Sequence, residues 1–257
     1  MNHIVILRAL LKGALRDKIS IGWAVAFPLL LIAGMRIAFG ESLDEMRLLA
    51  GTVAFSTIFF AVHGTGFDIL GQRARGVYKL LRASPYSVAG FIVWLILARG
   101  AITVAAALGV AVLGGWWLGM ALTPGLLLGL CLSAAFGAVA FSALGVIMGN
   151  LGDTEGAVSA WNNLVTFPLL FLTETFYSLE TAPAWIQVVR DALPFNHYLT
   201  LTRHLAEGAL AGAWPYALIT LGFGAVFLAG AILTFRWDPG QTLWTWPSSL
   251  AKRRLGP

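Results

Sequence analysis

Few residues of this sequence have the types and the spacing that catalysis requires. His197 and His204 are seven positions apart and would supply only two metal ligands. The sequence contains no Gly-x-Ser-x-Gly elbow, no His-Glu-x-x-His zinc helix and no Gly-x-x-x-x-Gly-Lys-Ser/Thr phosphate loop. We therefore expect neither an enzyme active site nor a metal site, and we expect a separate subunit to handle any ATP and Mg²⁺.

Ionisable and amide side chains inside apolar segments are the residues that transport could use. Asp68 and Arg99 lie near the ends of apolar runs, where an Asp to Arg pair is tolerated. His63 lies deeper, just before Gly64 and Gly66, where a packing role is more common than a proton relay. Asn162 and Asn163 first suggest hydrogen bonds between helices and second a lining for a substrate pathway. Ion-driven carriers usually bury more ionisable groups, but an ion-coupled secondary transporter stays open as an alternative.

The elements that carry these side chains are apolar enough to lie in a bilayer. Hydrophobic residues make up 58% of the 257 residues and charged residues only 11%, with a mean hydropathy of +0.81. A water-soluble surface cannot be built from this composition. The net charge of +5 comes from basic residues placed between apolar runs. This placement indicates topology signals rather than nucleic-acid binding.

We predict an all-α membrane protein with a single transmembrane domain over residues 1–257. Six runs approach or exceed the roughly 20 apolar residues needed to cross a bilayer. They cover residues 19–39, 48–70, 89–118, 124–148, 157–177 and 214–235. Prolines break the segment 178–212, for which we predict two short re-entrant helices at the outer interface, with a seventh span as the alternative. Residues 1–18 have the periodicity of an amphipathic interface helix, and residues 237–257 form a tail.

The distribution of basic residues predicts the orientation. Loops rich in lysine and arginine stay in the cytoplasm. Most of the basic residues fall before the first span, after the second span and after the last: Arg8, Lys12, Arg16, Lys18, Arg73, Arg75, Lys79, Arg82, Arg236, Lys252, Arg253 and Arg254. We therefore predict that both termini are cytoplasmic and that residues 237–257 are a cytoplasmic tail.

Glycines recur at multiples of four along the fourth predicted span. They include Gly125, Gly129, Gly137, Gly145 and Gly149. A stripe of small residues allows another helix to approach closely. We interpret the stripe first as packing within one subunit, and second as a dimer contact or a pathway wall.

The loop after the second span, residues 72–85, combines basic residues, an apolar pair and a proline. It resembles the short cytoplasmic helix of ABC type-2 transporter permeases, in which Glu-Arg-x-x-Gly precedes a leucine pair and Ala-Thr-Pro or Ala-Ser-Pro. The matching residues are Gly76, Leu80, Leu81, Ala83, Ser84 and Pro85. Gln72 stands where the family usually has glutamate, so the salt bridge of that glutamate is not expected here.

A second stretch, residues 168–203, is similar to the proline and aromatic series that precedes the last span of the same family. Glu174 replaces what is commonly a small residue there. A carboxylate at the edge of hydrocarbon is costly unless it is paired or faces water. We expect Glu174 to face an outer vestibule or polar neighbours, or else the span to end near Leu172 and leave Glu174 in bulk water.

The resemblance implies a permease subunit of an ATP-driven exporter in a prokaryotic plasma (inner) membrane. It implies two separate ABC ATPase subunits on the cytoplasmic face, a second permease copy or paralogue, contact with membrane lipids, no nucleic acid and no cofactor on this chain. Residues 72–88 would be the cytoplasmic coupling segment, with contacts at Arg75, Gly76, Lys79, Leu80, Leu81, Arg82 and Pro85. Asn162, Asn163 and Glu174 are the candidate pathway residues.

Several alternatives remain open at this point. The substrate could be a drug-like amphiphile or a lipid-linked glycan, and a purely structural membrane subunit is a further possibility. The Ala-Arg-Gly sequences at 74–76 and 98–100 also resemble the scaffold subunit of energy-coupling-factor importers. In that family the motifs lie in two long cytoplasmic helices late in the chain. Here Arg99 lies in an apolar run of the first half, which disfavours that family.

Overall fold

The computed structural model describes residue 13 and residues 18–40, 44–82, 87–179 and 181–236. These residues form helices and turns and contain no strand. In chain order the helices are α2 (Lys18–Phe39), α3 (Glu45–Phe59), the π-helix η2 (Phe60–Gly64), α4 (Thr65–Ala74), α5 (Val77–Arg82), α6 (Val88–Trp117), α7 (Pro124–Leu151), α8 (Glu155–Phe171), α9 (Ala184–Ala192), α10 (Pro194–Ala206) and α11 (Leu210–Leu233). The all-α prediction is confirmed for this part of the chain.

The starts of four helices follow from their capping residues. Asp44 accepts hydrogen bonds from the backbone N–H groups of the first turn of α3, and Ser87 caps α6 in the same way. Thr123 caps α7 and is followed by Pro124 at the first helical position, while Thr154 caps α8. Each side-chain oxygen satisfies N–H groups that have no partner inside the helix.

Four helical segments of the described chain are long and apolar enough to cross a membrane. They are Glu45–Ala74, which joins α3, η2 and α4, then Val88–Trp117, Pro124–Leu151 and Leu210–Leu233. The first predicted span coincides with α2, whose apolar part Val25–Phe39 is shorter. The fifth coincides with α8, which has 17 residues. The structure therefore supports four of the six predicted crossings by length, and the other two remain a prediction.

Helix α8 ends earlier than the predicted span 157–177. Its last helical residue is Phe171, and Leu172 is its C-cap. Beyond this point the hydroxyl of Thr173 donates to the carbonyl of Leu169 at 2.7 Å and lies 2.9 Å from the hydroxyl of Thr175. Side-chain hydrogen bonds of this kind compete with the helical pattern and end the helix while the sequence is still apolar.

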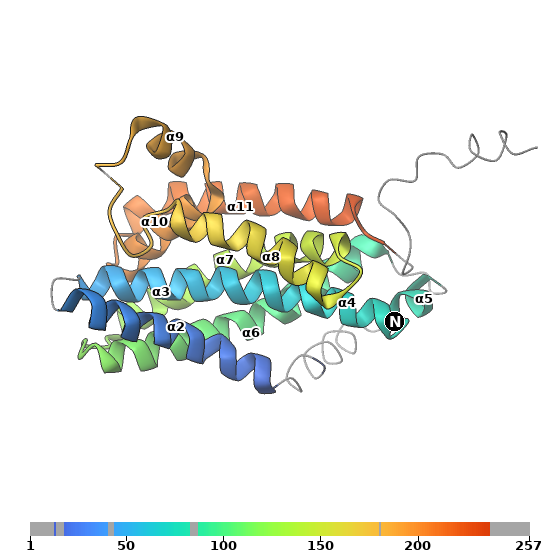
Figure 1. Ribbon diagram of the computed structural model, residues 1–257, viewed down its shortest axis with the longest axis horizontal. Helices are drawn as coiled ribbons and strands as arrows, with labels where there is room; N and C mark the ends of the chain where they lie inside the picture. Colours follow the sequence, from blue (N-terminus) through green and yellow to red (C-terminus); the bar gives the residue numbers. More distant parts are fainter. Residues whose placement is uncertain (1–12, 14–17, 41–43, 83–86, 180, 237–257) are drawn as a thin grey trace, which may run out of the picture.

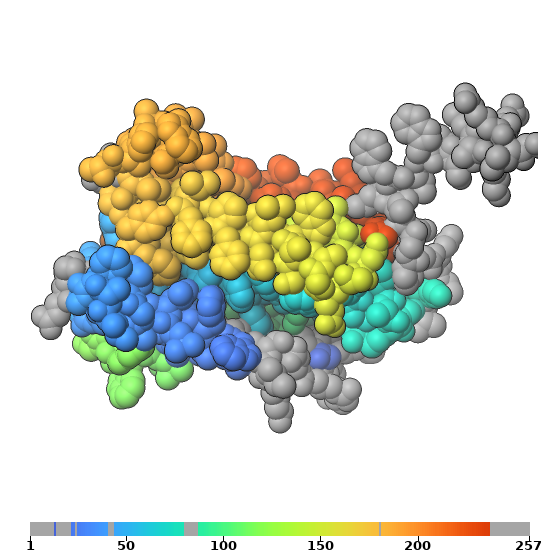
Figure 2. All heavy atoms as spheres, in the orientation of Figure 1, coloured from blue at the N-terminus to red at the C-terminus, as the bar shows by residue number. Residues whose placement is uncertain are grey.

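Helix α7 occupies the centre of a bundle in which α2, α3, α6, α8 and α11 run side by side along the long axis (Figure 1). Helices α4 and α5 lie at one end of this bundle, and α9 and α10 lie at the other (Figure 1). Phe141 of α7 packs against Phe195 and Tyr198 of α10, which are fully buried. Figure 2 shows that α8, in yellow, lies uncovered along one side of the bundle.

The glycines of α7 face helices of the same chain. A Cβ atom on Gly129 would collide with the carbonyl of Leu205, and one on Gly137 would collide with the ring of Tyr198, both in α10. A Cβ atom on Gly145 would lie 2.7 Å from the Val62 carbonyl oxygen. A Cβ atom on Gly149 would lie 2.6 Å from the carbonyl oxygen of Gly66. At Gly125 the nearest atom would be 4.0 Å away, so this glycine has no close neighbour. Missing side chains on α7 thus allow the backbones of α10, η2 and α4 to approach closely.

The segment 178–212 contains two short helices with different environments. Helix α9 has no buried residue, whereas α10 buries Phe195, Tyr198 and Leu199 among others. The sequence interpretation treated both as helices at the interface, so the burial of α10 was not expected. The reason is the glycine stripe of α7, which leaves the space that the large side chains of α10 fill.

The π-helix η2 was not predicted either. It inserts an extra residue into one turn of the second span, at Phe60–Gly64. It lies where Gly145 of α7 approaches the carbonyl groups of Ala61 and Val62. The predictions for the N-terminal interface helix, for the tail 237–257 and for Pro85 concern residues outside the described ranges, apart from Gly13 and Lys18.

Candidate coupling surface and polar clusters

The bundle brings together the segments that the orientation rule assigned to the same side. Helix α5, the corner after α7 and Arg236 lie at one end. Asp44, Glu174, Arg190 and Arg203 lie at the other. The placement of the two groups at opposite ends agrees with the predicted sidedness. Which end faces the cytoplasm stays a prediction.

The candidate coupling segment begins with a sharp turn at Gly76. Its φ angle of +71° lies in the left-handed region, which favours glycine, and its N–H donates to the carbonyl of Arg73 at 3.0 Å. The turn ends α4 and allows α5 to start at Val77. Arg75 and Lys79 are exposed at this end. The side chains of Leu80, Leu81 and Arg82 lie outside the described part, so their predicted contacts are not tested.

Tyr78 fixes α5 to the bundle. Its side chain is fully buried, and its hydroxyl donates to the carbonyl of Ile69 at 3.2 Å. The ring lies 5.7 Å from that of Phe91 in α6 and 5.0 Å from that of Phe235, after α11. Burial raises the pKa of Tyr78 well above its ordinary value, because the phenolate would lose its hydration. Sequence analysis missed this anchor, although a lone aromatic residue in a basic segment was a visible signal.

Two buried arginines bind the C-terminal end of α7. Arg73, only 2% exposed, donates to the carbonyl oxygens of Gly149 at 2.7 Å and Gly152 at 3.1 Å. Arg236, 6% exposed, donates to the carbonyl oxygen of Asn150 at 2.9 Å. Asp153 lies 3.5 Å from Arg73 and 2.9 Å from Arg236. We call Arg73, Arg236, Asp153 and the carbonyls of Gly149, Asn150 and Gly152 the α7 clamp.

The α7 clamp satisfies carbonyl groups that a helix end leaves without partners, and its two cations match the negative end of the helix dipole. Sequence analysis interpreted Arg73 and Arg236 as topology signals only. Nothing in the local sequence distinguishes an arginine in solvent from one that folds back onto a helix terminus 70 or more residues away.

A second polar cluster lies near the middle of the second span. Asp68 and Arg99 form the pair that the sequence allowed, with 3.5 Å between Oδ2 and Nε. Arg99 also donates to the carbonyl of Gly64, which belongs to the π-helix. His63 lies 3.1 Å from Oδ1 of Asn163, so α8 and η2 share a hydrogen bond. Asn162 is fully buried against Gly66.

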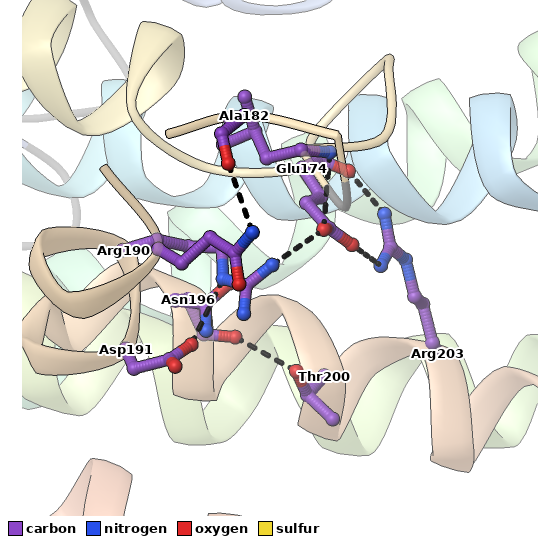
Figure 3. A network of polar contacts seen from close by, with 9 residues as sticks. Glu174, Ala182, Arg190, Asp191, Asn196, Thr200 and Arg203 are labelled. Atoms are coloured by element: carbon purple, nitrogen blue, oxygen red, sulfur yellow. Dashed lines mark hydrogen bonds and ion pairs between the residues drawn. The ribbon is translucent and has the colours of Figure 1, made fainter. Parts of the chain in front are cut away.

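Glu174 lies at the opposite end of the bundle in a third cluster (Figure 3). Its carboxylate accepts from Nη1 of Arg190 at 2.8 Å and from the N–H of Leu179 at 3.2 Å. Nη1 of Arg203 lies 3.8 Å away, and Arg203 also donates to the backbone carbonyl of Glu174. The Glu174 side chain is 15% exposed. Each of the two expectations is therefore right in part: the helix ends near Leu172, as the second one stated, and Glu174 has polar neighbours, as the first one stated.

Arg190 connects this cluster to the surface. Its Nε donates to Asp191 at 2.8 Å, and Asp191 is 60% exposed (Figure 3). The hydrogen bond to Asp191, followed by the nearby carboxylate of Glu174, raises the pKa of Arg190, so its charge is permanent. Helix α9 is tethered to the end of α8 through this arginine.

The other two histidines of the described ranges, His197 and His204, lie beside one aromatic ring. The imidazoles of His197 and His204 stack on Tyr216, with ring centroids 6.3 Å and 5.6 Å away. Within the described ranges no group of three or more histidine, cysteine, aspartate or glutamate side chains could hold a metal ion.

Comparison with known proteins adds an independent line of evidence. The profile of the family described as ABC-2 type transporter matches residues 3–206. A daunorubicin resistance ABC transporter permease protein, DrrB1 of Streptomyces coeruleorubidus, is 38% identical over 99 residues. These residues are 37% of this chain and 32% of the relative, so the match spans about a third of the relative's length. Since the family profile covers most of the chain, including the loop 72–85, the corner after α7 and the Glu174 cluster, the chain belongs to the ABC-2 type transporter family.

Proposed function

We propose that this chain is the transmembrane permease subunit of an ATP-driven exporter, and that a separate ATPase drives it from the cytoplasmic face. The observation that carries the proposal is α5, in which Lys79 is exposed while the neighbouring Tyr78 is buried and contacts three parts of the bundle. An ATPase that binds such a segment can displace it, and the contacts of Tyr78 can transmit the displacement to the spans. The family match and the absence of a phosphate loop from the sequence support it.

The nucleotide chemistry belongs to the partner in this proposal. ATP and Mg²⁺ bind the ATPase subunits, while this chain supplies contacts in the coupling segment 72–88 and the transport pathway. Two ATPase subunits and a second permease copy or paralogue complete the complex. All six long helices α2, α3 to α4, α6, α7, α8 and α11 cross the membrane, with both termini in the cytoplasm of a prokaryotic cell.

For the substrate we propose a drug-like amphiphile that leaves the cell. The support is the drug resistance function in the name of the relative. Helix α8 is the candidate pathway wall, since it carries Asn162, Asn163 and, just past its end, Glu174, and since its outer face is uncovered (Figure 2). A lipid-linked glycan is the second substrate class. An ion-coupled carrier is disfavoured because Asp68 and Arg99, which could bind a coupling ion, neutralise each other.

Reversal of charge on α5 tests the proposal. The permease is reconstituted in liposomes with its ATPase partner, and ATP hydrolysis is measured with and without daunorubicin as the probe. The variant Lys79→Glu with Arg82→Glu should lose substrate-stimulated hydrolysis while its insertion into the membrane stays normal. Glu207→Lys, an exposed charge reversal at the opposite end, is the matched control.

Gly76→Pro provides a second variant at the same segment. Proline cannot adopt the positive φ of Gly76 and lacks the N–H that bonds to Arg73, so α5 should be misplaced. Full retention of stimulated hydrolysis in both variants would refute the assignment of the coupling segment.

A further inference from the structure

We propose that the α7 clamp transmits displacement of the coupling segment to α8, so that Arg73 and Arg236 are positioning residues for transport. This inference deepens the proposed function and rests on it. It starts from an arrangement that the fold alone does not require. Arginines at a helix terminus usually remain in water, yet both guanidinium groups here are almost fully buried. Arg73 bonds to Gly149, Asn150 and Gly152, Arg236 bonds to Asn150, and both pair with Asp153.

The first step concerns where the clamp is attached. Arg73 lies one residue before the end of α4 and three residues before Gly76, so it moves with the turn into α5. Arg236 follows Phe235, whose ring packs on Tyr78 of α5. Any rigid displacement of α5 therefore reaches the clamp through both arginines.

The second step concerns the corner between α7 and α8. Only Gly152, Asp153 and Thr154 separate the two helices. A Cβ atom on Gly152 would lie 2.7 Å from the backbone nitrogen of Val158, so the corner is packed directly against the first turns of α8. Thr154 caps α8 by accepting from the N–H of Ala157 at 3.2 Å. A corner this short and tightly packed passes a displacement of residues 149–152 to α8 without a flexible linker.

The third step concerns which helix is free to respond. The outer face of α8 is uncovered, with Leu164 62% and Phe171 61% exposed, whereas most of α3 is buried (Figure 2). A helix with few buried contacts moves at a lower cost in free energy than a core helix. It also carries Asn162 and Asn163, so its movement would rearrange the proposed pathway.

A second route from α4 to α8 exists and must be separated from the clamp. Gly66 of α4 lies against Asn162 and Val158 of α8. This contact involves close packing but no directional bond, and Arg73→Lys leaves it intact. Lysine keeps the charge of arginine but replaces a planar fork of five donors by a single ammonium group. It cannot reach the carbonyls of Gly149 and Gly152 in the same geometry.

The test follows the two ends of the transmission in one complex. Single cysteines at Lys79 and at Leu164, in a Cys131→Ser background, carry an environment-sensitive fluorophore in the permease bound to its ATPase in liposomes. Both positions are exposed. In the parent protein, a non-hydrolysable ATP analogue should change the emission at both positions. In Arg73→Lys the change in emission at 79 should persist. The effect of the nucleotide on the equilibrium constant between the two positions of α8, reported at 164, should be about tenfold smaller, as expected for the loss of one charge-assisted hydrogen bond.

Two further variants complete the design. Arg36→Lys makes the same replacement in an ion pair outside the clamp, 3.2 Å from Glu45, and should leave both responses unchanged. Asp153→Asn removes a carboxylate of the clamp that is 58% exposed, so the fold should tolerate it. This variant should also reduce the response at 164, and it tests the clamp independently should Arg73→Lys prevent assembly of the complex.

The outcomes separate the two proposals. A parent complex without a response at 79 would overturn the proposed function, and the clamp proposal with it. A parent that responds at both positions, with an undiminished response at 164 in Arg73→Lys or in Asp153→Asn, would overturn the clamp alone and leave the contacts of Gly66 and His63 with α8 as the route.

Discussion

Replacement of Glu174 by glutamine removes one charge from a cluster in which two arginines share a single, partly buried carboxylate. Glutamine keeps an acceptor for Arg190 and for the N–H of Leu179, but its amide NH₂ group would face Arg203, donor to donor. Charge-assisted hydrogen bonds are roughly twice as strong as neutral ones, at about 1.5–3 kcal/mol. Weakening the bond to Arg190 and losing the attraction to Arg203 should therefore cost about 2 kcal/mol.

The loss should be local, because α9 buries no side chain of its own and is held to the bundle through Arg190. Hydrogen exchange of the amides of Ala184–Ala192 should accelerate about thirtyfold in Glu174→Gln. Asp191→Asn is the matched control, since Asp191 contacts the same arginine at the same 2.8 Å but is 60% exposed. A solvated pair contributes at most about 1 kcal/mol, so the control should accelerate exchange no more than about fivefold.

Two results would contradict this account of the cluster. Equal acceleration in both variants would show that burial does not strengthen the pair with Glu174, and unchanged exchange in Glu174→Gln would show that the cluster does not hold α9. If Glu174 also borders the exit path, the same variant should reduce export of cationic substrates more than of neutral ones. Equal effects on both substrate classes, at unchanged ATP hydrolysis, would limit Glu174 to its structural role.

Three further outcomes follow from features described above. Cysteine at Ala182 should react with an impermeant reagent in intact cells and cysteine at Lys79 only after permeabilisation, and the reverse pattern would invert the topology. Gly145→Ala should lower the stability by about 1–3 kcal/mol in thermal unfolding because its Cβ would press on the carbonyls of Ala61 and Val62, whereas Gly222→Ala, with open space around it, should not. Tyr78→Phe should cost about 1 kcal/mol at pH 7, because the bond to the Ile69 carbonyl is lost. Since burial raises the pKa of Tyr78 in the folded state, its contribution is complete below about pH 10 and decreases as the pH rises from there through the folded-state value, so the difference in unfolding free energy between the two proteins should be smaller at pH 10.5 than at pH 7.

The positions of the long helices could be predicted because apolar runs and capping residues are local signals. The predicted runs 89–118 and 124–148 differ from α6 and α7 by no more than three residues at either end. The predicted end of the fifth span, at residue 177, lay beyond the last residue of α8, because hydropathy takes no account of the hydrogen bond from the hydroxyl of Thr173 to the last turn. The burial of α10 depends on which helix faces the glycines of α7, and that is decided by tertiary packing.

For the polar clusters, too, local sequence signals predicted some contacts, and tertiary packing decided the others. The pairing of Asp68 with Arg99 could be anticipated, because two opposite charges in apolar segments need each other. The α7 clamp could not, since the positive-inside rule already accounts for every basic residue near a cytoplasmic end. An arginine satisfies that rule equally well in water or folded onto a helix terminus. Only the spatial arrangement shows that Arg73 and Arg236 both bind Asn150 and Asp153 at the end of α7.

The extra residue in η2 sets the rotational phase of everything after it in the second span. One residue of an α-helix corresponds to about 100° of rotation. If Phe60–Gly64 adopted a regular α-helix with every residue retained, Asp68 and Arg73 would turn by about that angle relative to α3. Asp68 would then point away from Arg99, and Arg73 away from the end of α7. The π-turn is thus the phase adjustment that lets one continuous helix present its first half to α10 and its second half to α7 and Arg99.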